Sequence, residues 1–76
     1  MERKKILVLV VGAGDAGALI AQRFNENDPS LEAYECVGFV DDDEGKLGKK
    51  IHGYEILGTI NQIPEIVNEY GIKLVS

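Results

Sequence analysis

An uninterrupted apolar run followed at once by regularly spaced glycines constrains this chain more than any other feature of its sequence. The run is Ile6-Leu7-Val8-Leu9-Val10-Val11, and Gly12, Gly14 and Gly17 come directly after it. Because no polar residue interrupts the run, it predicts a strand buried on both faces, as in a parallel sheet covered by helices. The glycine spacing predicts a tight turn that opens into a helix, which is the fingerprint of dinucleotide-binding βαβ units.

The three glycines of this turn have different expected roles. Gly12 allows a tight turn out of the strand, Gly14 leaves the backbone open to a pyrophosphate, and Gly17 lets the helix approach the strand closely. The free amide groups at the start of the helix provide a binding site for an anion. The glycine pattern alone is a weak signal, and it gains weight from the strand before it and the helix after it. It predicts nucleotide binding at residues 12–17.

Strands and helices alternate along the remainder of the chain. Four strands are expected, at residues 5–11, 33–40, 54–57 and 72–76, with a polar loop at 41–53. A first helix is expected at residues 15–27, and a second follows the capping box Thr59-Ile60-Asn61-Gln62 and ends at Gly71. The alternation predicts a three-layer α/β fold, with a mainly parallel four-stranded sheet in the order 3-2-1-4 and helices on both faces.

This topology places the glycines at the carboxyl ends of the strands, beside the switch point between the first and last strands, where α/β sheets bind ligands. The last expected strand ends with the last residue of the sequence. We therefore expect residues 1–76 to be a single nucleotide-binding domain excised from a longer chain.

An acidic residue at the end of the second strand is the second marker of a nucleotide site. Asp41 follows Val40 directly and is placed to accept hydrogen bonds from ribose hydroxyls. It lies further than the usual ~20 residues from the glycines, and the turn at residues 27–31 accounts for the difference. The alternative is a solvated acid at a strand end. The acidic residues that follow are expected to be solvated, with a divalent-ion site as the other interpretation: Asp42, Asp43 and Glu44.

Asp15 is an unusual residue for this turn. The helix macrodipole stabilises a carboxylate in the first turn, where it can also cap free amides, but the same charge repels a pyrophosphate. We therefore expect weaker nucleotide binding than a neutral residue here would allow. The candidate binding residues are Gly12, Gly14, Asp15, Ala16, Gly17, Asp41 and Asp42.

Composition argues against several other classes of protein. A formal net charge of −5 disfavours nucleic-acid binding, which needs a basic face. No segment approaches the ~20 apolar residues that span a bilayer, so no direct membrane insertion is expected. The single cysteine, Cys36, fits a reducing, cytoplasmic compartment and is expected to act as a small apolar side chain.

The remaining reactive side chains form no recognisable catalytic or metal-binding set. His52 is the only histidine and is expected to be a loop residue with one local hydrogen bond. Lys46, Lys49 and Lys50 either neutralise the acidic residues beside them or meet a phosphate. The 76 residues are therefore expected to bind a ligand without an active site of their own.

Five blocks of the sequence, taken in order, resemble one family. They are Val10-Val11-Gly12-Ala13-Gly14-Asp15-Ala16-Gly17, Val37-Gly38-Phe39-Val40-Asp41-Asp42-Asp43, Lys46-Leu47-Gly48, Ile51-His52-Gly53 and Ile56-Leu57-Gly58. Together they resemble the Rossmann-like, CoA-binding-type domain of bacterial polysaccharide-biosynthesis proteins of the CapD type, which are membrane-linked nucleotide-sugar epimerases and dehydratases. The resemblance covers residues 5–76.

The resemblance implies a Rossmann-like fold and a nucleotide site at Gly12, Gly14, Gly17 and Asp41. In that family a separate catalytic domain carries NAD(P) and the catalytic residues, so the epimerase or dehydratase activity is not implied for these residues. The implied partner is that catalytic domain, and the implied location is cytoplasmic, with the parent chain anchored at the cytoplasmic face of the inner membrane. Similar blocks occur in initiating sugar-phosphate transferases, sugar acetyltransferases and redox-sensing transcriptional repressors. The repressors also need a winged-helix DNA-binding part, which the 76 residues do not supply.

Three functions remain open at this point. The first is a nucleotide-binding accessory or regulatory domain of a nucleotide-sugar enzyme, with NAD, another adenine or uridine nucleotide, or a nucleotide-sugar as ligand. The second is a structural module that forms homo-oligomers or docks on the catalytic domain, its glycines kept only for packing. The third is a sensor of NAD(H). The charge of Asp41 favours an unphosphorylated ribose.

Overall fold

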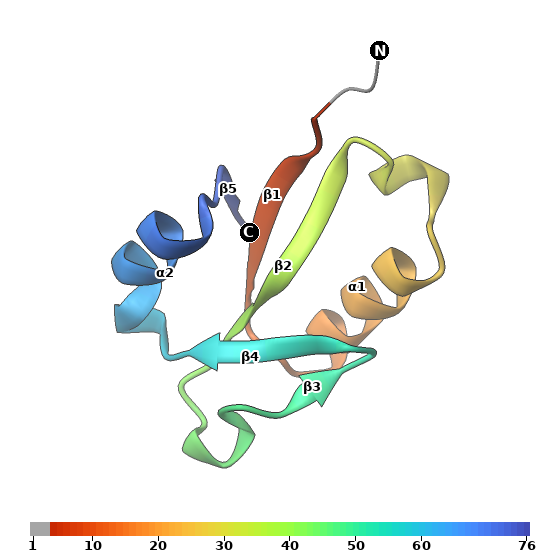
Figure 1. Ribbon diagram of the computed structural model, residues 1–76. Coiled ribbons are helices and arrows are strands. Elements are labelled where there is room, and N and C mark those ends of the chain that lie inside the picture. The colour runs from red at the N-terminus through yellow and green to blue at the C-terminus, as the bar shows by residue number, and fades with distance from the viewer. Residues whose placement is uncertain (1–3) are drawn as a thin grey trace.

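The computed structural model describes residues 4–76 and has two helices and five strands in those residues. The chain runs through β1 (Ile6–Val11), α1 (Asp15–Asn25), β2 (Tyr34–Val40), β3 (Lys50–Ile51), β4 (Tyr54–Gly58), α2 (Ile63–Tyr70) and β5 (Leu74–Val75). Short 3₁₀ turns connect them: η1 (Pro29–Leu31), η2 (Glu44–Lys46) and η3 (Ile60–Gln62). Figure 1 shows β1 and β2 side by side in the middle of the sheet.

The sheet has the order β3-β4-β2-β1-β5, and the four strands from β4 to β5 are parallel. The predicted α/β class and the predicted order of those four strands are confirmed. The predicted strand count is wrong, because β3 pairs antiparallel with β4 inside the segment expected to be a loop. His52 and Gly53 make this hairpin possible, since their φ values of 48° and 89° are the positive values that a two-residue type I′ turn requires.

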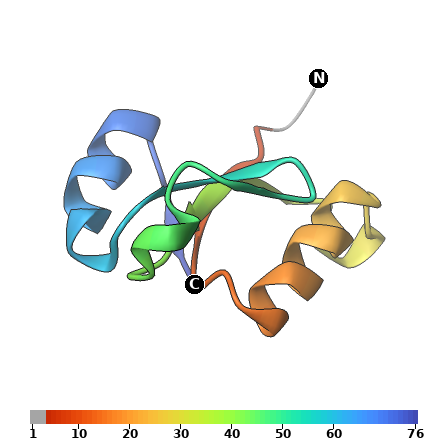
Figure 2. The same ribbon diagram turned by 90° about the horizontal axis from the view of Figure 1, so that it is seen from below.

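The central strand β1 contributes to both faces of the sheet. Its alternating side chains pack on opposite sides: Val8 and Val10 join the cluster beneath α1, whereas Leu9 joins the cluster beneath α2. The first cluster also contains Ala21 of α1 and Phe39 of β2. Figure 2 shows the two helices on opposite faces of the sheet. The three-layer arrangement explains why the β1 sequence has no polar alternation.

The helix boundaries follow from local backbone chemistry. Helix α1 ends at Asn25, two residues before the expected end, because Asn27 has a φ of 56° and cannot continue a right-handed helix. The predicted capping box is confirmed: the Thr59 amide donates to Oε1 of Gln62 at 2.9 Å. Gly71, with a φ of 69°, ends α2 in the left-handed conformation.

Cys36 lies in β2 and is buried against the α1 side of the sheet. Burial raises the pKa of its thiol to about 11, so the thiol stays protonated at neutral pH. The structure therefore confirms the apolar role expected for this residue. Within residues 4–76, no helix is both long and apolar enough to cross a membrane.

Candidate functional site

The glycine turn joins the carboxyl end of β1 to the start of α1. Gly12 has a φ of +92°, which side chains rarely tolerate, and its amide donates to the Val40 carbonyl oxygen at 2.8 Å. A methyl group on Gly17 would overlap the carbonyl oxygen of Gly12 and would lie 3.2 Å from the Phe39 ring. Gly12 is therefore needed for the turn, and Gly17 for the close approach of α1 to it.

Gly14 differs from both of these glycines. Its φ of −82° is accessible to every residue, and a methyl group added to it would meet no heavy atom within 4 Å in residues 4–76, its chain neighbours aside. Neither the conformation of the turn nor the packing of the protein explains a glycine here. Gly14 is also the N-cap of α1 and has no side chain to cap the first amides of the helix. The backbone at this point is open to an external anion.

Asp41 lies beside the turn, as predicted. Its Oδ2 accepts a hydrogen bond from the Ala13 amide at 2.8 Å, and its Oδ1 accepts one from the Asp43 amide at 2.8 Å. These two amides, in that order, lower the pKa of the Asp41 carboxyl below its ordinary value, and the ammonium of Lys46 lowers it further. Asp41 therefore connects the end of β2 to the glycine turn while its side chain stays 17% exposed.

This hydrogen bonding predicts a specific pH dependence of stability. Because the pKa of Asp41 is lowered in the folded state, its stabilising effect is present above the unfolded value of about 3.9 and is lost as pH falls through the folded value. We expect Asp41→Asn to have a lower Tm than the wild type at pH 7, and the difference to shrink below about pH 4. Thermal melts followed by circular dichroism over pH 2 to 7 measure this.

Glu44→Gln is the matched control, because it removes an exposed charge from the same acidic segment without touching the turn. Its Tm difference from the wild type is expected to be small at neutral pH. A Tm difference for Asp41→Asn that stayed constant from pH 7 to pH 2 would contradict the role assigned to the carboxylate.

Lys46, for which the sequence left open either neutralisation of the neighbouring acids or a contact with phosphate, reaches the same turn. Its Nζ lies 3.8 Å from Oδ2 of Asp41 and donates to the carbonyl oxygen of Ala13 at 3.5 Å. Within residues 4–76, the pair with Asp41 is the one ion pair. The sequence distance between Lys46 and the glycines concealed this contact, and a cation just beyond the acidic end of β2 was the only signal for it.

The other candidate residues surround the turn in different ways. Asp15 and Ala16 are exposed in the first turn of α1, next to the open amides. Asp42 is exposed, as expected, and its Oδ1 in addition accepts a hydrogen bond from the Ile60 amide at 2.9 Å, which holds the start of η3. Asp43 caps η2 by accepting from the Gly45 amide at 2.9 Å. In residues 4–76, no cluster of His, Cys, Asp and Glu side chains is arranged to hold a metal ion.

The end of β5 completes the surroundings of the site. Ser76 accepts a hydrogen bond from the Val11 amide at 2.6 Å, and the Ser76 amide donates to the Leu9 carbonyl oxygen at 3.0 Å. Figure 2 shows the end of the chain beside the beginning of the turn that follows β1. The turn therefore lies at the point where the sheet reverses its order, between β2 on one side and β5 on the other.

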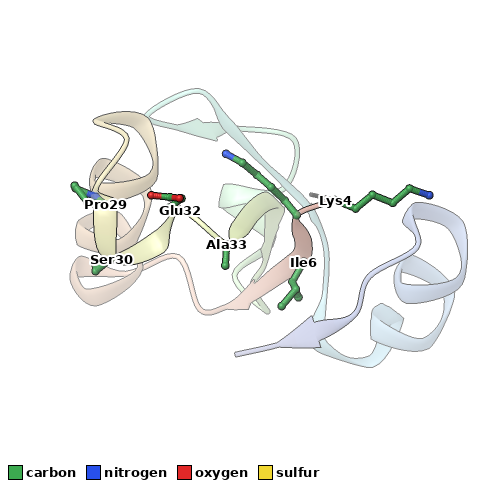
Figure 3. Close-up of a pocket in the computed structure, with 7 residues that line it drawn as sticks. Lys4, Ile6, Pro29, Ser30, Glu32 and Ala33 are labelled. Atoms are coloured by element: carbon green, nitrogen blue, oxygen red, sulfur yellow. The ribbon is translucent and has the colours of Figure 1, made fainter. Parts of the chain in front are cut away.

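A cavity of about 850 Å³ lies at the opposite edge of the sheet, at the amino ends of β1 and β2 (Figure 3). Its walls include Lys4, Ile6, Pro29, Ser30, Glu32 and Ala33. The side chain of Lys4 extends away from Glu32 and Ser30. We place the candidate site at the glycine turn, where an open backbone, a carboxylate and an ammonium come together.

The fold and the glycine turn define a Rossmann-like domain of the nucleotide-binding type. The chain belongs to the CoA-binding domain family, which it matches over residues 1–76. It is 41% identical over 69 residues to the redox-sensing transcriptional repressor Rex of Carboxydothermus hydrogenoformans, an alignment that covers 88% of this chain and 30% of Rex. The crystal structure of UDP-D-quinovosamine 4-dehydrogenase from Vibrio fischeri has the same fold, with a TM-score of 0.77 and 25% identity. That match covers 95% of this chain and 55% of the dehydrogenase chain.

Proposed function

We propose that this domain binds a phosphate-bearing nucleotide at the glycine turn, with NAD as the first ligand to test. The open backbone of Gly14, at the N-cap of α1 and beside Asp41, carries the proposal, because no contact or backbone strain within residues 4–76 explains a glycine at this position. Membership of the CoA-binding domain family and the likeness to a UDP-sugar dehydrogenase support it. The ligand's pyrophosphate contacts the amides around Gly14, Asp15 and Ala16.

Asp41 is the residue we assign to the ribose. Its two oxygens each accept one hydrogen bond from a backbone amide, and a carboxylate offers about four acceptor sites in all. It therefore retains the capacity to accept from ribose hydroxyls. The pKa of Asp41 is lowered, so its negative charge persists at neutral pH and disfavours a 2′-phosphate. Asp42 flanks this part of the site.

We assign the domain to a longer protein, as the accessory or regulatory part of a CapD-type nucleotide-sugar epimerase or dehydratase that works at the cytoplasmic side of a membrane. The chain spans 30% of the length of the curated relative it matches and 55% of the dehydrogenase chain. The partner in this proposal is the catalytic domain of the same chain. The named activity of the dehydrogenase, on a UDP-sugar, is the observation that favours nucleotide-sugar chemistry.

A second candidate function is the sensing of NAD(H). The observation that favours it is the 41% identity to a repressor whose name describes redox sensing. A sensor must distinguish the two redox forms of its ligand, so this candidate requires a clear difference between the affinities for NAD⁺ and NADH. Equal affinities would leave the accessory role as the better account.

Calorimetry and thermal-shift measurements with NAD⁺, NADH, NADP⁺, CoA and UDP-sugars test both candidates. We expect NAD to bind more tightly than NADP, because the charge of Asp41 repels the 2′-phosphate. Saturating ligand stabilises a folded protein by mass action, so a bound nucleotide raises the Tm. If none of these compounds changes the Tm or produces heat at millimolar concentration, the binding proposal fails for the domain.

Asp15 gives a further prediction about the strength of binding. Its carboxylate lies exposed in the first turn of α1, beside the proposed phosphate position. We expect Asp15→Asn to bind the best ligand more tightly at low salt, and the gain to decrease as salt screens the charge. The same change removes a favourable interaction with the helix dipole of about 0.3–1 kcal/mol, so a slightly lower stability is expected. Unchanged affinity at low salt would rule out the repulsion.

A further inference from the structure

Lys46 stands out because its contacts are long for a charged group. An ammonium that has settled on a carboxylate or a carbonyl usually lies about 2.7–2.9 Å from the oxygen. Nζ of Lys46 is instead 3.8 Å from Oδ2 of Asp41 and 3.5 Å from the carbonyl oxygen of Ala13. The side chain is 37% exposed. The ammonium therefore lies at the glycine turn without a short hydrogen bond to either Asp41 or Ala13.

The backbone that carries Lys46 is held on both sides. Before it, the Asp43 carbonyl oxygen accepts from the Lys46 amide at 2.9 Å, and Asp43 is itself tied to Asp41. After it, the Lys49 amide donates to the Lys46 carbonyl oxygen at 3.0 Å, and the Gly48 amide donates to Ile56 at 3.0 Å. The fold of this segment therefore places the Lys46 side chain at the turn.

We propose that the ammonium of Lys46 binds a phosphate oxygen of the nucleotide. When the ligand binds, Lys46 exchanges its contacts with Ala13 and Asp41 for this contact with the phosphate. This inference rests on the proposed function. The site otherwise presents the carboxylates of Asp15 and Asp41 to an anionic ligand, and Lys46 is the cation that offsets them. Giving up two long contacts costs little, and a charge-assisted bond to phosphate replaces them. The ligand class is a nucleotide with at least a diphosphate.

The test compares ADP and UDP with adenosine and uridine, titrated against the wild type and Lys46→Gln by calorimetry and NMR at low salt. We expect Lys46→Gln to weaken ADP and UDP binding about tenfold, in line with the loss of one charge-assisted bond, and to leave nucleoside binding within twofold. Lys46→Arg retains the charge and is expected to recover most of the affinity. The Tm of Lys46→Gln stays close to that of the wild type, because a partly exposed ion pair whose charged atoms are 3.8 Å apart contributes little to stability.

Lys49→Gln is the matched control, since it removes the same charge from an exposed lysine of the same segment. We expect it to change diphosphate affinity by less than twofold. Equal losses for Lys46→Gln and Lys49→Gln, or equal weakening of nucleosides and diphosphates by Lys46→Gln, would overturn the proposal while the nucleotide site stood. A wild-type protein that bound neither diphosphate would instead overturn the proposed function, and this inference with it.

Discussion

Gly17→Ala is expected to destabilise the domain strongly. The added methyl group overlaps the carbonyl oxygen of Gly12, which cannot rotate away because the Ala13 amide of the same peptide unit donates to Asp41. On its other side the methyl group meets the Phe39 ring, which is completely buried. Helix α1 can relieve the overlap only by moving off the sheet, and that movement breaks the packing of Ala21 in the core.

The size of the effect follows from the small total stability of a short domain. At roughly 0.05–0.15 kcal/mol per residue, 76 residues correspond to about 4–11 kcal/mol. Overpacking costs about 1–3 kcal/mol, and the overlap with a fixed backbone oxygen places this substitution at the upper end of that range; the better helix propensity of alanine returns only about 1 kcal/mol. We expect Gly17→Ala to lower the Tm by about 10 °C or more, or to fail to fold.

Thermal and urea denaturation of the wild type, Gly17→Ala and Gly14→Ala measure this effect. Gly14→Ala is the matched control, because it makes the same chemical change in the same turn where the structure leaves space. A Gly17→Ala protein that melted within about 3 °C of the wild type would contradict the close approach of α1 to the turn.

The sequence predicted the parts of the fold that depend on repeating patterns. The apolar run of β1 and the three glycines located the turn, and the alternation of strands and helices determined the parallel order from β4 to β5. The acid at the end of β2 was placed correctly at the turn, because topology alone brings the carboxyl ends of β1 and β2 together. These features follow from hydrophobic patterns and from sheet topology, and both depend on many residues at once.

The segment at residues 41–53 was less predictable, because single side chains determine its structure. Asp43 caps η2, and Asp42 holds the start of η3, although an acidic run usually indicates a solvated loop. His52 adopts a positive φ at a position where asparagine or glycine is the usual signal of a hairpin, so β3 was missed. The approach of Lys46 to Ala13 depends on the fold of that whole segment, and the local sequence signals it only by a cation just beyond the acidic end of β2.

Gly14→Ala is expected to abolish most nucleotide binding while leaving the protein folded. Two small effects on the free energy of unfolding nearly cancel. Alanine lowers the conformational entropy of the unfolded chain, which stabilises the folded state by about 0.4–1 kcal/mol. It is also a poorer N-cap residue than glycine, which destabilises the helix by a similar amount. Apart from its chain neighbours, the methyl group meets no heavy atom of the described part of the chain within 4 Å, so the Tm is expected to stay within about 5 °C of the wild type. A pyrophosphate on the backbone would meet it directly.

The affinity of Gly14→Ala for NAD or the best nucleotide in the screen therefore separates the two main interpretations of the turn. A site that receives a pyrophosphate loses at least tenfold in affinity, about 1.4 kcal/mol, when a methyl group stands where the phosphate approaches. If the domain is a structural module whose glycines serve packing alone, Gly17→Ala lowers its stability, whereas Gly14→Ala changes neither its stability nor its function. If Gly14→Ala binds the nucleotide as well as the wild type does, the ligand lies elsewhere and the glycine turn is only a tight connection between β1 and α1.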